Sequence, residues 1–401
     1  MNAKLLGSLL LSWVFIFGMT QAGLIGPNRS SIEAEFGLSH AVFGLAIAVI
    51  QCVSACIMML IARQLQRYKS LIVLSGGLCV QSLGYYAIML SHSSLGLVGG
   101  WLMIMLGSTA GTVTNNLSML LFTGNPRKGV MLLHSFNAIG KIAGPLLAAI
   151  CLMLSWRSSF LVVGIITSAL CVFVFCSQPY IGTIPRPATT RTHFDSRVVR
   201  RPFFWLSILP FGLIGGGEIA FAALMPTFYQ ETQGFTKSAA SLLLTVHLLG
   251  LAAGRLVSVP LNQRVSNNAI IGGCLLAGLA VFPAVFLPHS MLLYPMLFLV
   301  GVMFSCIWPT FYAQASLFHQ DYPDLFAYGT TFGNALGTAG CVYLSSLIAD
   351  HNLRLSLLFC PGVLWLFGLI YFTTRLSHAP KPALREPRPS AVARQTTVAV
   401  K

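Results

Sequence analysis

Twelve long apolar stretches alternate with short polar segments along this chain of 401 residues. A helix that crosses a lipid bilayer needs about 20 apolar residues, and each stretch is of that order. The pattern therefore predicts an all-α membrane protein with twelve transmembrane helices. The predicted spans are 5–26, 41–62, 71–90, 95–122, 130–154, 158–177, 203–229, 238–259, 268–287, 291–318, 325–349 and 353–373.

The longest polar interruption inside the chain divides the predicted spans into two sets of six. It covers residues 178–202 and carries five arginines and four prolines. This composition is typical of a flexible basic linker. The linker predicts an N-terminal half over 1–177 and a C-terminal half over 203–374. Residues 375–401 are basic and contain prolines, which predicts a disordered cytoplasmic tail.

Composition also points to a lipid environment. The chain is 56% hydrophobic and 8% charged, whereas soluble domains contain about 25% charged residues. The net charge of +15 raises the possibility of a nucleic-acid partner. However, the basic residues lie in short segments between apolar stretches, and a nucleic-acid binder gathers them on one folded face. We therefore expect contact with membrane lipid and none with nucleic acid.

The basic residues also predict how the chain lies in the membrane. If both termini are cytoplasmic, 19 of the 24 Lys and Arg residues fall in cytoplasmic segments and four fall outside. Basic loop residues concentrate on the cytoplasmic side of membrane proteins. We therefore predict a multi-pass protein of the cell inner (plasma) membrane with both termini in the cytoplasm.

The two predicted halves repeat each other at an offset of 197 residues. The segment Asn137–Gly140 recurs as Asn334–Gly337 with one conservative change. Two basic residues recur at the same offset, as the pairs Arg157 and Arg354, and Arg67 and Arg264. Parallel repeats of this kind predict two pseudo-symmetric six-helix halves, related by an axis along the membrane normal.

Lys141 and Glu218 are the two charged residues that we place well within predicted spans. At 1.5 Å per residue from the cytoplasmic end of each span, Lys141 lies roughly 16 Å deep and Glu218 roughly 22 Å deep. A charge near the middle of the bilayer costs at least about 2.5–3.5 kcal/mol, so such residues are candidates for function. We predict that both take part in proton coupling. Lys141 is either the counter-ion of Glu218 or a ligand for a substrate carboxylate.

Uncharged polar residues near the same depth are candidates for substrate binding. Subtracting the repeat offset from Glu218 leads to Gln21, which we expect opposite Glu218. Amide side chains bridge hydroxyl groups, and an aromatic ring stacks on the C–H face of a sugar. Each such side chain is equally compatible with a hydrogen bond between helices. The other candidates are Asn115, Asn116, Asn137, His247, Trp308, Tyr312 and Asn334.

Other classes of membrane protein find little support. A membrane enzyme needs catalytic side chains clustered at one interface, and the nine acids of this chain form no such cluster. No phosphate-binding loop of the form Gly-x-x-x-x-Gly-Lys-Ser/Thr occurs. The chain also has no repeated filter sequence of the kind that a channel needs. All ten cysteines lie in apolar stretches, away from outer loops. We expect no enzyme activity, no cofactor, no metal and no disulfide framework.

Several short motifs along the whole chain resemble the major facilitator superfamily, and most closely its fucose permease-like branch of sugar–proton symporters. They are Leu132–Phe136 with Gly140, Gly144 and Pro145; Ser155-Trp156-Arg157; Gly215-Gly216-Gly217-Glu218; Gly254-Arg255 at the end of the eighth span; and Trp308-Pro309-Thr310. The chain departs from that branch in having no acid in the first and fourth spans.

The resemblance implies a monomeric secondary transporter that moves a small-molecule substrate with protons by alternating access. Spans one and seven would line its central cavity. The basic residues assigned to the gating motif of the inner loops are Arg63, Arg67, Arg255 and Arg264. The pair Gly144-Pro145 also resembles the fifth-span motif of drug–proton antiporters, so export of an organic solute in exchange for protons is the alternative.

Overall fold

The computed structural model describes residues 3–65, 68–123, 126–181, 196–281, 286, 291–319 and 323–378, and these residues are almost entirely helical. The N-terminal half contains α1 (Ala3–Gly18), η1 (Met19–Leu24), α2 (Ile25–Phe36), α3 (His40–Leu65), α4 (Ser70–Leu90), α5 (Ser94–Thr123), α6 (Pro126–Cys151) and α7 (Trp156–Ile181). The C-terminal half contains α9 (Pro202–Gln233), α10 (Lys237–Arg264), α11 (Asn267–Val281), α12 (Leu293–Ser316), α13 (Pro323–Ala349) and α14 (Leu353–Thr373).

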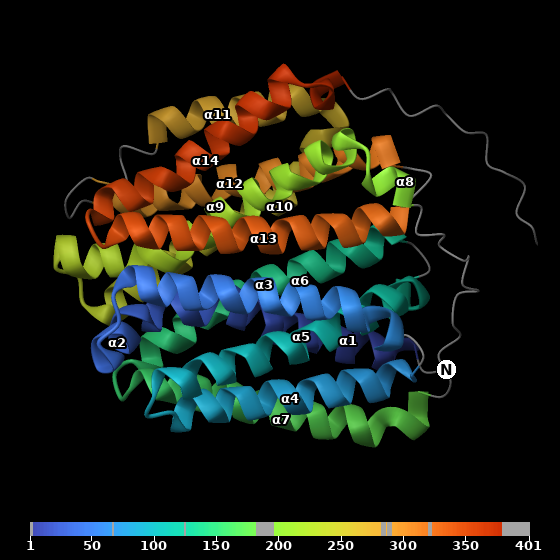
Figure 1. The fold of residues 1–401 in the computed structure, drawn as a ribbon, viewed down its shortest axis with the longest axis vertical. Coiled ribbons are helices and arrows are strands. Elements are labelled where there is room, and N and C mark those ends of the chain that lie inside the picture. Colours follow the sequence, from blue (N-terminus) through green and yellow to red (C-terminus); the bar gives the residue numbers. More distant parts are fainter. Residues whose placement is uncertain are drawn as a thin grey trace, which may run out of the picture.

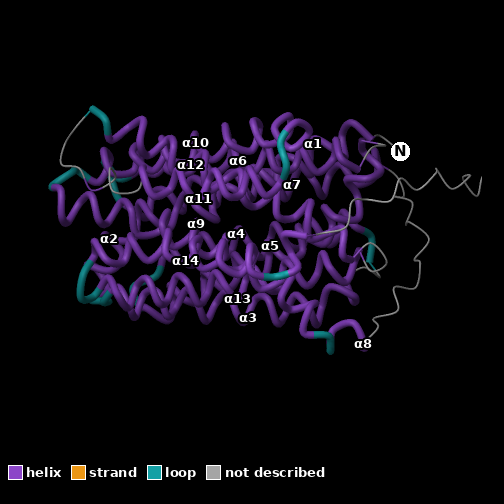
Figure 2. The backbone as a smooth tube through the Cα atoms, turned by 90° about the horizontal axis from the view of Figure 1, so that it is seen from above, coloured by secondary structure: helices purple, strands orange, loops and turns teal. Residues whose placement is uncertain are grey.

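These helices lie side by side along one axis and form a single bundle (Figures 1 and 2). Within the described residues, ten helices are long and apolar enough to cross a membrane. Two further apolar helices, Ser135–Cys151 and Asn267–Leu279, are shorter and fall on the predicted fifth and ninth spans. The predicted all-α fold with twelve spans is confirmed. We call the end at which α2 meets α3 the outer end, after the predicted orientation.

Helix packing repeats between the two halves. Helix α4 packs against α5 and α7, as α11 packs against α12 and α14. Helix α1 packs against α6, as α9 packs against α13. The halves meet where α3 packs against α13 and α6 packs against α10, two contacts that exchange under the same pseudo-symmetry (Figure 1).

Individual contacts also repeat at the predicted offset. A Cβ atom at Gly140 would lie 2.0 Å from the carbonyl oxygen of Phe15, so these two backbones touch. A Cβ atom at Gly337, 197 positions later, would lie 2.2 Å from the Cα atom of Gly212, which is 197 positions after Phe15. Small residues allow such close approach of helices, and the offset read from the sequence is therefore the structural repeat.

The outer turns follow the repeat as well. Helix α2 ends at Gly37 and α9 at Gly234, which have φ angles of 62° and 71°. This left-handed conformation is open to glycine at little cost. Ser39 and Thr236 follow, and each accepts a hydrogen bond from the backbone N–H three residues later. Both pairs of residues are 197 positions apart.

The first span differs from its prediction. Residues 27–36 were expected outside the membrane helix, yet α2 continues without a break to Phe36 after one π-helical turn at Met19–Leu24. Arg29 is one of the four basic residues that the predicted topology places outside, and it is fully buried within α2. Its partner Glu33 lies one helical turn away, and the ion pair between them lets this charged segment pack inside the protein.

The predicted linker and tail lie mostly outside the described residues. Between α7 and α9 the structure describes a short helix, α8 (Ser196–Val199). The beginning of the predicted tail forms η4 (Arg375–His378), whose Leu376 is buried and whose backbone accepts hydrogen bonds from Gln314 and Asn268. The division at these segments remains a prediction.

Candidate functional site

Lys141 and Glu218 form an ion pair inside the bundle. The Lys141 Nζ atom lies 2.8 Å from Glu218 Oε1, and both side chains are almost completely buried. Lys141 belongs to α6 and Glu218 to α9, so the pair joins the two halves. Glu218 lies in the middle of its helix, 16 residues after Pro202 and 15 before Gln233. Of the two roles considered for Lys141, its position supports the role of counter-ion.

Small residues beside the pair explain how these helices come close enough. Glu218 follows three glycines, and a Cβ atom at Gly216 would lie 2.7 Å from the carbonyl oxygen of Gly337 on α13. On α6, a Cβ atom at Gly144 would lie 2.5 Å from the Cα atom of Gly23. These backbone contacts fix the positions of α6 and α9 from which the two charged side chains meet.

Arg255 adds a third charge that the sequence did not place at this site. We assigned it to the gating motif at the end of the eighth span, but α10 continues for nine residues beyond it, to Arg264. The side chain of Arg255 is partly buried, with 21% of it exposed, and its Nη2 atom lies 3.9 Å from Glu218 Oε1. The predicted span 238–259 already contained Arg255, but near its cytoplasmic end; because the helix runs five residues further, Arg255 lies deeper than predicted and joins the two charges that we placed well within spans.

His247 lies on α10, eight residues before Arg255, and its side chain is fully buried. Its Nδ1 atom is 3.4 Å from the carbonyl oxygen of Leu297, and its ring packs against Phe221 and Phe304. Its Nε2 atom is buried without a hydrogen-bond partner among the described residues. The ring also interacts electrostatically with Glu218 and Lys141, so His247 belongs to the surroundings of the ion pair.

Two predicted aromatic ligands form a stack on α12. The rings of Trp308 and Tyr312 lie 5.3 Å apart and almost parallel, with an angle of 13° between them. Phe211 on α9 packs edge-on against both. Both stacked residues are only partly buried, so this aromatic cluster of the C-terminal half has surface left for a ligand.

Asn137 and Asn334 lie at equivalent contacts between helices. A Cβ atom at Gly18 would be 2.2 Å from the carbonyl oxygen of Asn137, and one at Gly215 would be 2.0 Å from Oδ1 of Asn334. Each asparagine therefore lies where the fifth or eleventh span crosses the first or seventh. This placement favours a structural contribution from both, and substrate binding by either stays a prediction.

Gln21 lies in a hollow of the N-terminal half. The hollow is formed between the first, second and fourth spans, and its polar lining comes from Thr20, Gln21, Gln51, Trp101 and Ser108. The indole nitrogen of Trp101 is buried and has no partner among the described residues. The amide groups of Gln21 and Gln51 are able to hydrogen bond a polar ligand in this hollow.

The described residues do not place the other predicted site residues at this site. The side chains of Asn115, Asn116, Arg63 and Arg67 lie outside the described residues. Arg264 is exposed at the end of α10. Among the described residues, no group of three or more His, Cys, Asp or Glu side chains is arranged to hold a metal ion.

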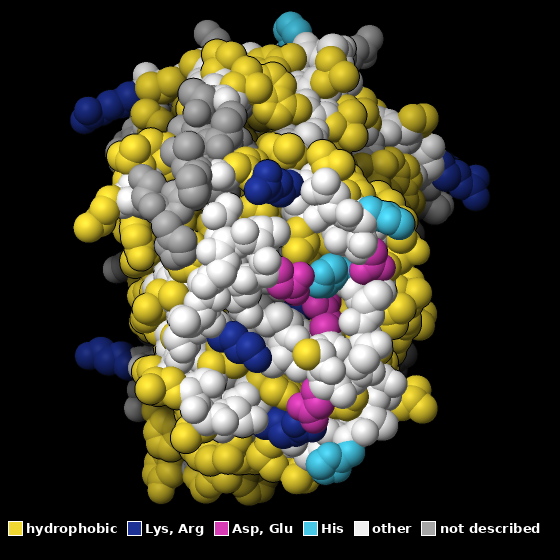
Figure 3. All heavy atoms as spheres, turned by 90° about the vertical axis from the view of Figure 1, so that its left-hand side faces the viewer, with side chains coloured by type: hydrophobic (Ala, Val, Ile, Leu, Met, Phe, Trp, Pro, Cys, Tyr) yellow, Lys and Arg dark blue, Asp and Glu magenta, His cyan; other side chains and the backbone are white. Residues whose placement is uncertain are grey.

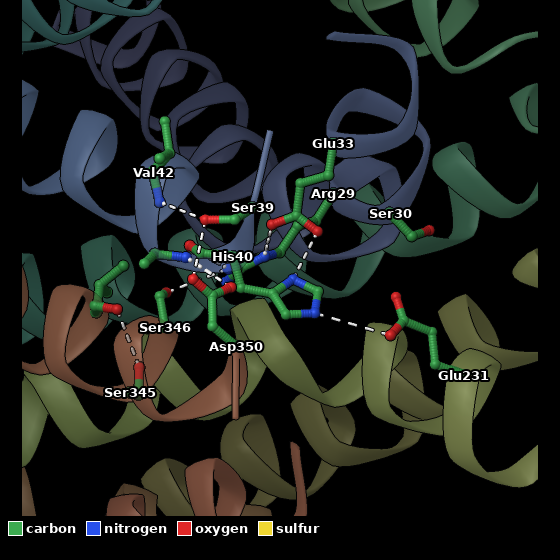
Figure 4. A network of polar contacts seen from close by, with 12 residues as sticks. Arg29, Ser30, Glu33, Ser39, His40, Val42, Glu231, Ser345, Ser346 and Asp350 are labelled. Carbon is green, nitrogen blue, oxygen red and sulfur yellow. Dashed lines mark hydrogen bonds and ion pairs between the residues drawn. The ribbon is translucent and has the colours of Figure 1, made fainter. Parts of the chain in front are cut away.

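A second polar network, which we did not predict, joins the halves at the outer end (Figure 4). Arg29 donates from Nε to Glu33 Oε1 at 2.7 Å and from Nη2 to the Ser346 hydroxyl at 3.2 Å. His40 has Nδ1 at 2.8 Å from Glu33 Oε2 and Nε2 at 3.7 Å from Glu231 Oε2. Since Ser346 and Glu231 belong to the C-terminal half, both links cross between the halves.

Further hydrogen bonds close the same end. Acidic and histidine side chains gather near the middle of the outer face, and hydrophobic side chains cover its margins (Figure 3). Around this centre, Ser39 donates to Asp350 at 2.9 Å and Ser30 donates to Gln230 at 2.7 Å. Lys237 donates to Ser31 at 2.8 Å. Each of these bonds joins one half to the other, so the outer ends of the halves are held together.

One ion pair of the outer face stays within a single half. Arg157 Nη1 lies 2.6 Å from Glu35 Oε2, and this hydrogen-bonded guanidinium lowers the pKa of the Glu35 carboxyl group. Arg157 also donates to the carbonyl groups of Met89 and Ser91 and lies over the ring of Trp156. Arg157 therefore ties the loop after the third span to the start of the sixth.

The fold and the buried charges define a polytopic membrane protein made of two pseudo-symmetric six-helix halves with an ionic contact between them. Residues 11–341 match the family model described as Major Facilitator Superfamily. The chain belongs to that superfamily of transporters.

Solved structures agree in fold. A bacterial homologue of the human lysosomal transporter Spinster, inward-facing and unoccupied, has 15% identity and a TM-score of 0.75, with 96% of this chain and 100% of that chain covered. The nucleoside transporter NupG has 12% identity and a TM-score of 0.71, with 95% and 100% covered. No curated protein gave a match. At these identities the likeness establishes the fold alone.

Proposed function

We propose that this protein is a secondary active transporter that moves a small polar solute, a sugar or a related compound, together with protons. One observation carries the proposal: the Lys141–Glu218 ion pair is buried in the middle of the bundle and joins the two halves. In alternating access the halves move against each other around a central site. If Glu218 binds a proton, it loses its ion pair with Lys141. The contact between the halves would then depend on protonation, which couples the proton to that movement.

The outer network supports a cycle in which this conformation is closed at its outer end. Its links cross between the halves and would have to open before solute could enter from outside. The inward-facing state named for the similar Spinster homologue is consistent with such a conformation. Protonation of Glu218 would release Lys141, and the solute would form new contacts with the residues that line the site.

Polar and aromatic groups in both halves support a polar solute. Trp308 and Tyr312 offer a stacked aromatic surface, and Gln21 belongs to a hollow with several hydrogen-bonding groups. The resemblance to the fucose permease-like branch supports a sugar. NupG, a structural neighbour, is a nucleoside transporter, and a nucleoside is a related polar compound with a sugar ring.

We expect the transporter to lie in the inner membrane with both termini in the cytoplasm. The loop charges support this orientation. A fluorescent protein fused to the C-terminus should glow, and alkaline phosphatase fused after Lys237 should be active. An inactive phosphatase together with a dark C-terminal fusion would reverse the orientation.

Solute-dependent proton movement tests the proposed function directly. Cells or right-side-out vesicles that contain the protein are given sugars, sugar acids or nucleosides while the pH of the medium is recorded. A symported solute should carry protons inward, and the medium should become more alkaline. Membranes without the protein serve as the control. If no solute of any charge moves protons, the proposed coupling is wrong.

The same measurement separates the alternative of export by proton antiport, which the pair Gly144-Pro145 favours. Gly144 packs directly against the first span, and the Pro145 carbonyl accepts a hydrogen bond from Ser241 on α10. This pair therefore lies at a contact between the halves, where an exchange motif would act. An antiporter that takes up added solute would release protons, and the medium would become more acidic.

A further inference from the structure

The central site carries more positive than negative charge. Lys141 and Arg255 both approach one carboxylate, and both are nearest to the same oxygen atom, Glu218 Oε1, at 2.8 and 3.9 Å. With all three groups ionised, the cluster has a net charge of +1. Positive charge without a partner is costly inside a membrane protein, because no bulk water solvates it.

The sequence has no second carboxylate to balance this charge. The chain contains nine acidic residues, and Glu218 is the one that lies within the middle of a span. The other eight belong to the outer end or to the linker, inner loop and tail. They are Glu33, Glu35, Glu231, Asp350, Asp195, Asp321, Asp324 and Glu386.

Hydrogen-bond donors at the site also lack acceptors. The Nη1 atom of Arg255 is shielded from solvent and has no hydrogen-bond partner among the described residues. A guanidinium group presents its N–H groups in a fork that matches the two oxygens of a carboxylate. A ligand that accepts hydrogen bonds and carries one negative charge would pair with the free N–H groups of Arg255 and would also balance the excess positive charge of the cluster.

We propose that the transported solute carries one carboxylate group, which binds between the Lys141 ammonium and the Arg255 guanidinium. This proposal rests on the proposed transport function and narrows its substrate class to organic monoanions, such as sugar acids. A carboxylate in this place takes over part of the contact that Lys141 makes with Glu218. Binding of the anion would therefore favour protonation of Glu218, so that solute and proton enter as a pair without net charge.

Paired solutes that differ in charge test this inference on the purified full-length protein. We choose glucuronate with glucose, galacturonate with galactose, and lactate with lactamide, and measure Kd by calorimetry together with the shift in Tm. In at least one pair the carboxylate should bind about tenfold more tightly than its neutral counterpart, as expected for charge-assisted hydrogen bonds. The inference is overturned if no pair shows this preference, or if sodium sulfate stabilises the protein as strongly as the best carboxylate.

Arg255→Gln is the deciding variant. It leaves the Lys141–Glu218 pair in place, so the site becomes neutral and the protein should fold. We expect the preference for the carboxylate to fall to about one, whereas Arg354→Gln, a change of an exposed arginine on α14, should keep it. A preference that survives Arg255→Gln contradicts the inference. A neutral solute that moves protons in the pH assay would keep the transport function and reject only the carboxylate.

Discussion

Replacement of Glu218 by glutamine should abolish uphill accumulation of solute driven by a proton gradient, while exchange between equilibrated sides continues. Glutamine keeps the shape of the side chain but cannot titrate. A pH gradient equivalent to 100 mV supplies about 2.3 kcal/mol per proton, which corresponds to about fiftyfold accumulation. In proteoliposomes the accumulation ratio should therefore fall from that order to about one. Counterflow of labelled solute should change by less than about threefold.

Glu35→Gln is the matched control for this experiment. Glu35 is partly exposed at the outer end, and its ion pair with Arg157 stays within one half. This variant should still accumulate solute. Rates are compared per folded transporter, because Glu218→Gln leaves Lys141 and Arg255 without their carboxylate and lowers stability. Continued accumulation by Glu218→Gln would show that Glu218 is not the coupling residue. Loss of exchange as well would indicate that Glu218 binds the solute.

The fold could be predicted in detail because each span has its own signal. The apolar length of each stretch sets the helix count, and the glycines at 140 and 337 mark contacts that recur at the same offset. The ion pair of Lys141 and Glu218 was among the possibilities, since both residues lie far from the ends of their spans. Its formation could not be derived, because it depends on how the two halves pack.

The depth of Arg255 was underestimated because hydropathy alone decided where the eighth span ends. The polar residues Asn262, Gln263 and Arg264 lower the average hydropathy, yet they continue the same helix. Arg29 was missed for a similar reason, because the polar sequence after Pro27 resembles a loop. A signal was present there: Arg29 and Glu33 are four residues apart and can pair on one helix face, and Gly37 then ends the helix.

The polar contacts between the halves at the outer end could not be predicted from any local sequence pattern. His40 meets Glu231 across 191 positions of sequence, and Ser39 meets Asp350 across 311. These contacts depend on the relative position of two halves that each fold from their own helices. A sequence pattern reports the apolar face of a helix, but it does not report which polar residue of the other half faces it.

Combining Lys141→Met with Glu218→Gln should restore stability that Glu218→Gln alone removes. Glu218→Gln leaves the buried Lys141 and the partly buried Arg255 without their carboxylate, and breaking a buried ion pair in this way costs about 3–5 kcal/mol. Removing the Lys141 charge as well relieves the repulsion between these two cations and returns the site to a net charge of +1. Lys141→Met alone should lower stability less than Glu218→Gln alone, because Arg255 still faces Glu218. It should nevertheless impair transport, because the ionic link between α6 and α9 is lost.

A double-mutant cycle on purified protein measures the coupling between these residues. Midpoints of thermal unfolding for the wild type, both single variants and the double variant should give an interaction of about 0.5–3 kcal/mol. The same cycle with Lys237→Met in place of Lys141→Met should be additive, since Lys237 binds Ser31 at the outer end. Additive losses in the Lys141–Glu218 cycle would mean that the two charges do not stabilise each other. The proton bound by Glu218 would then have no effect on the contact between the halves, and coupling would have to act through Arg255.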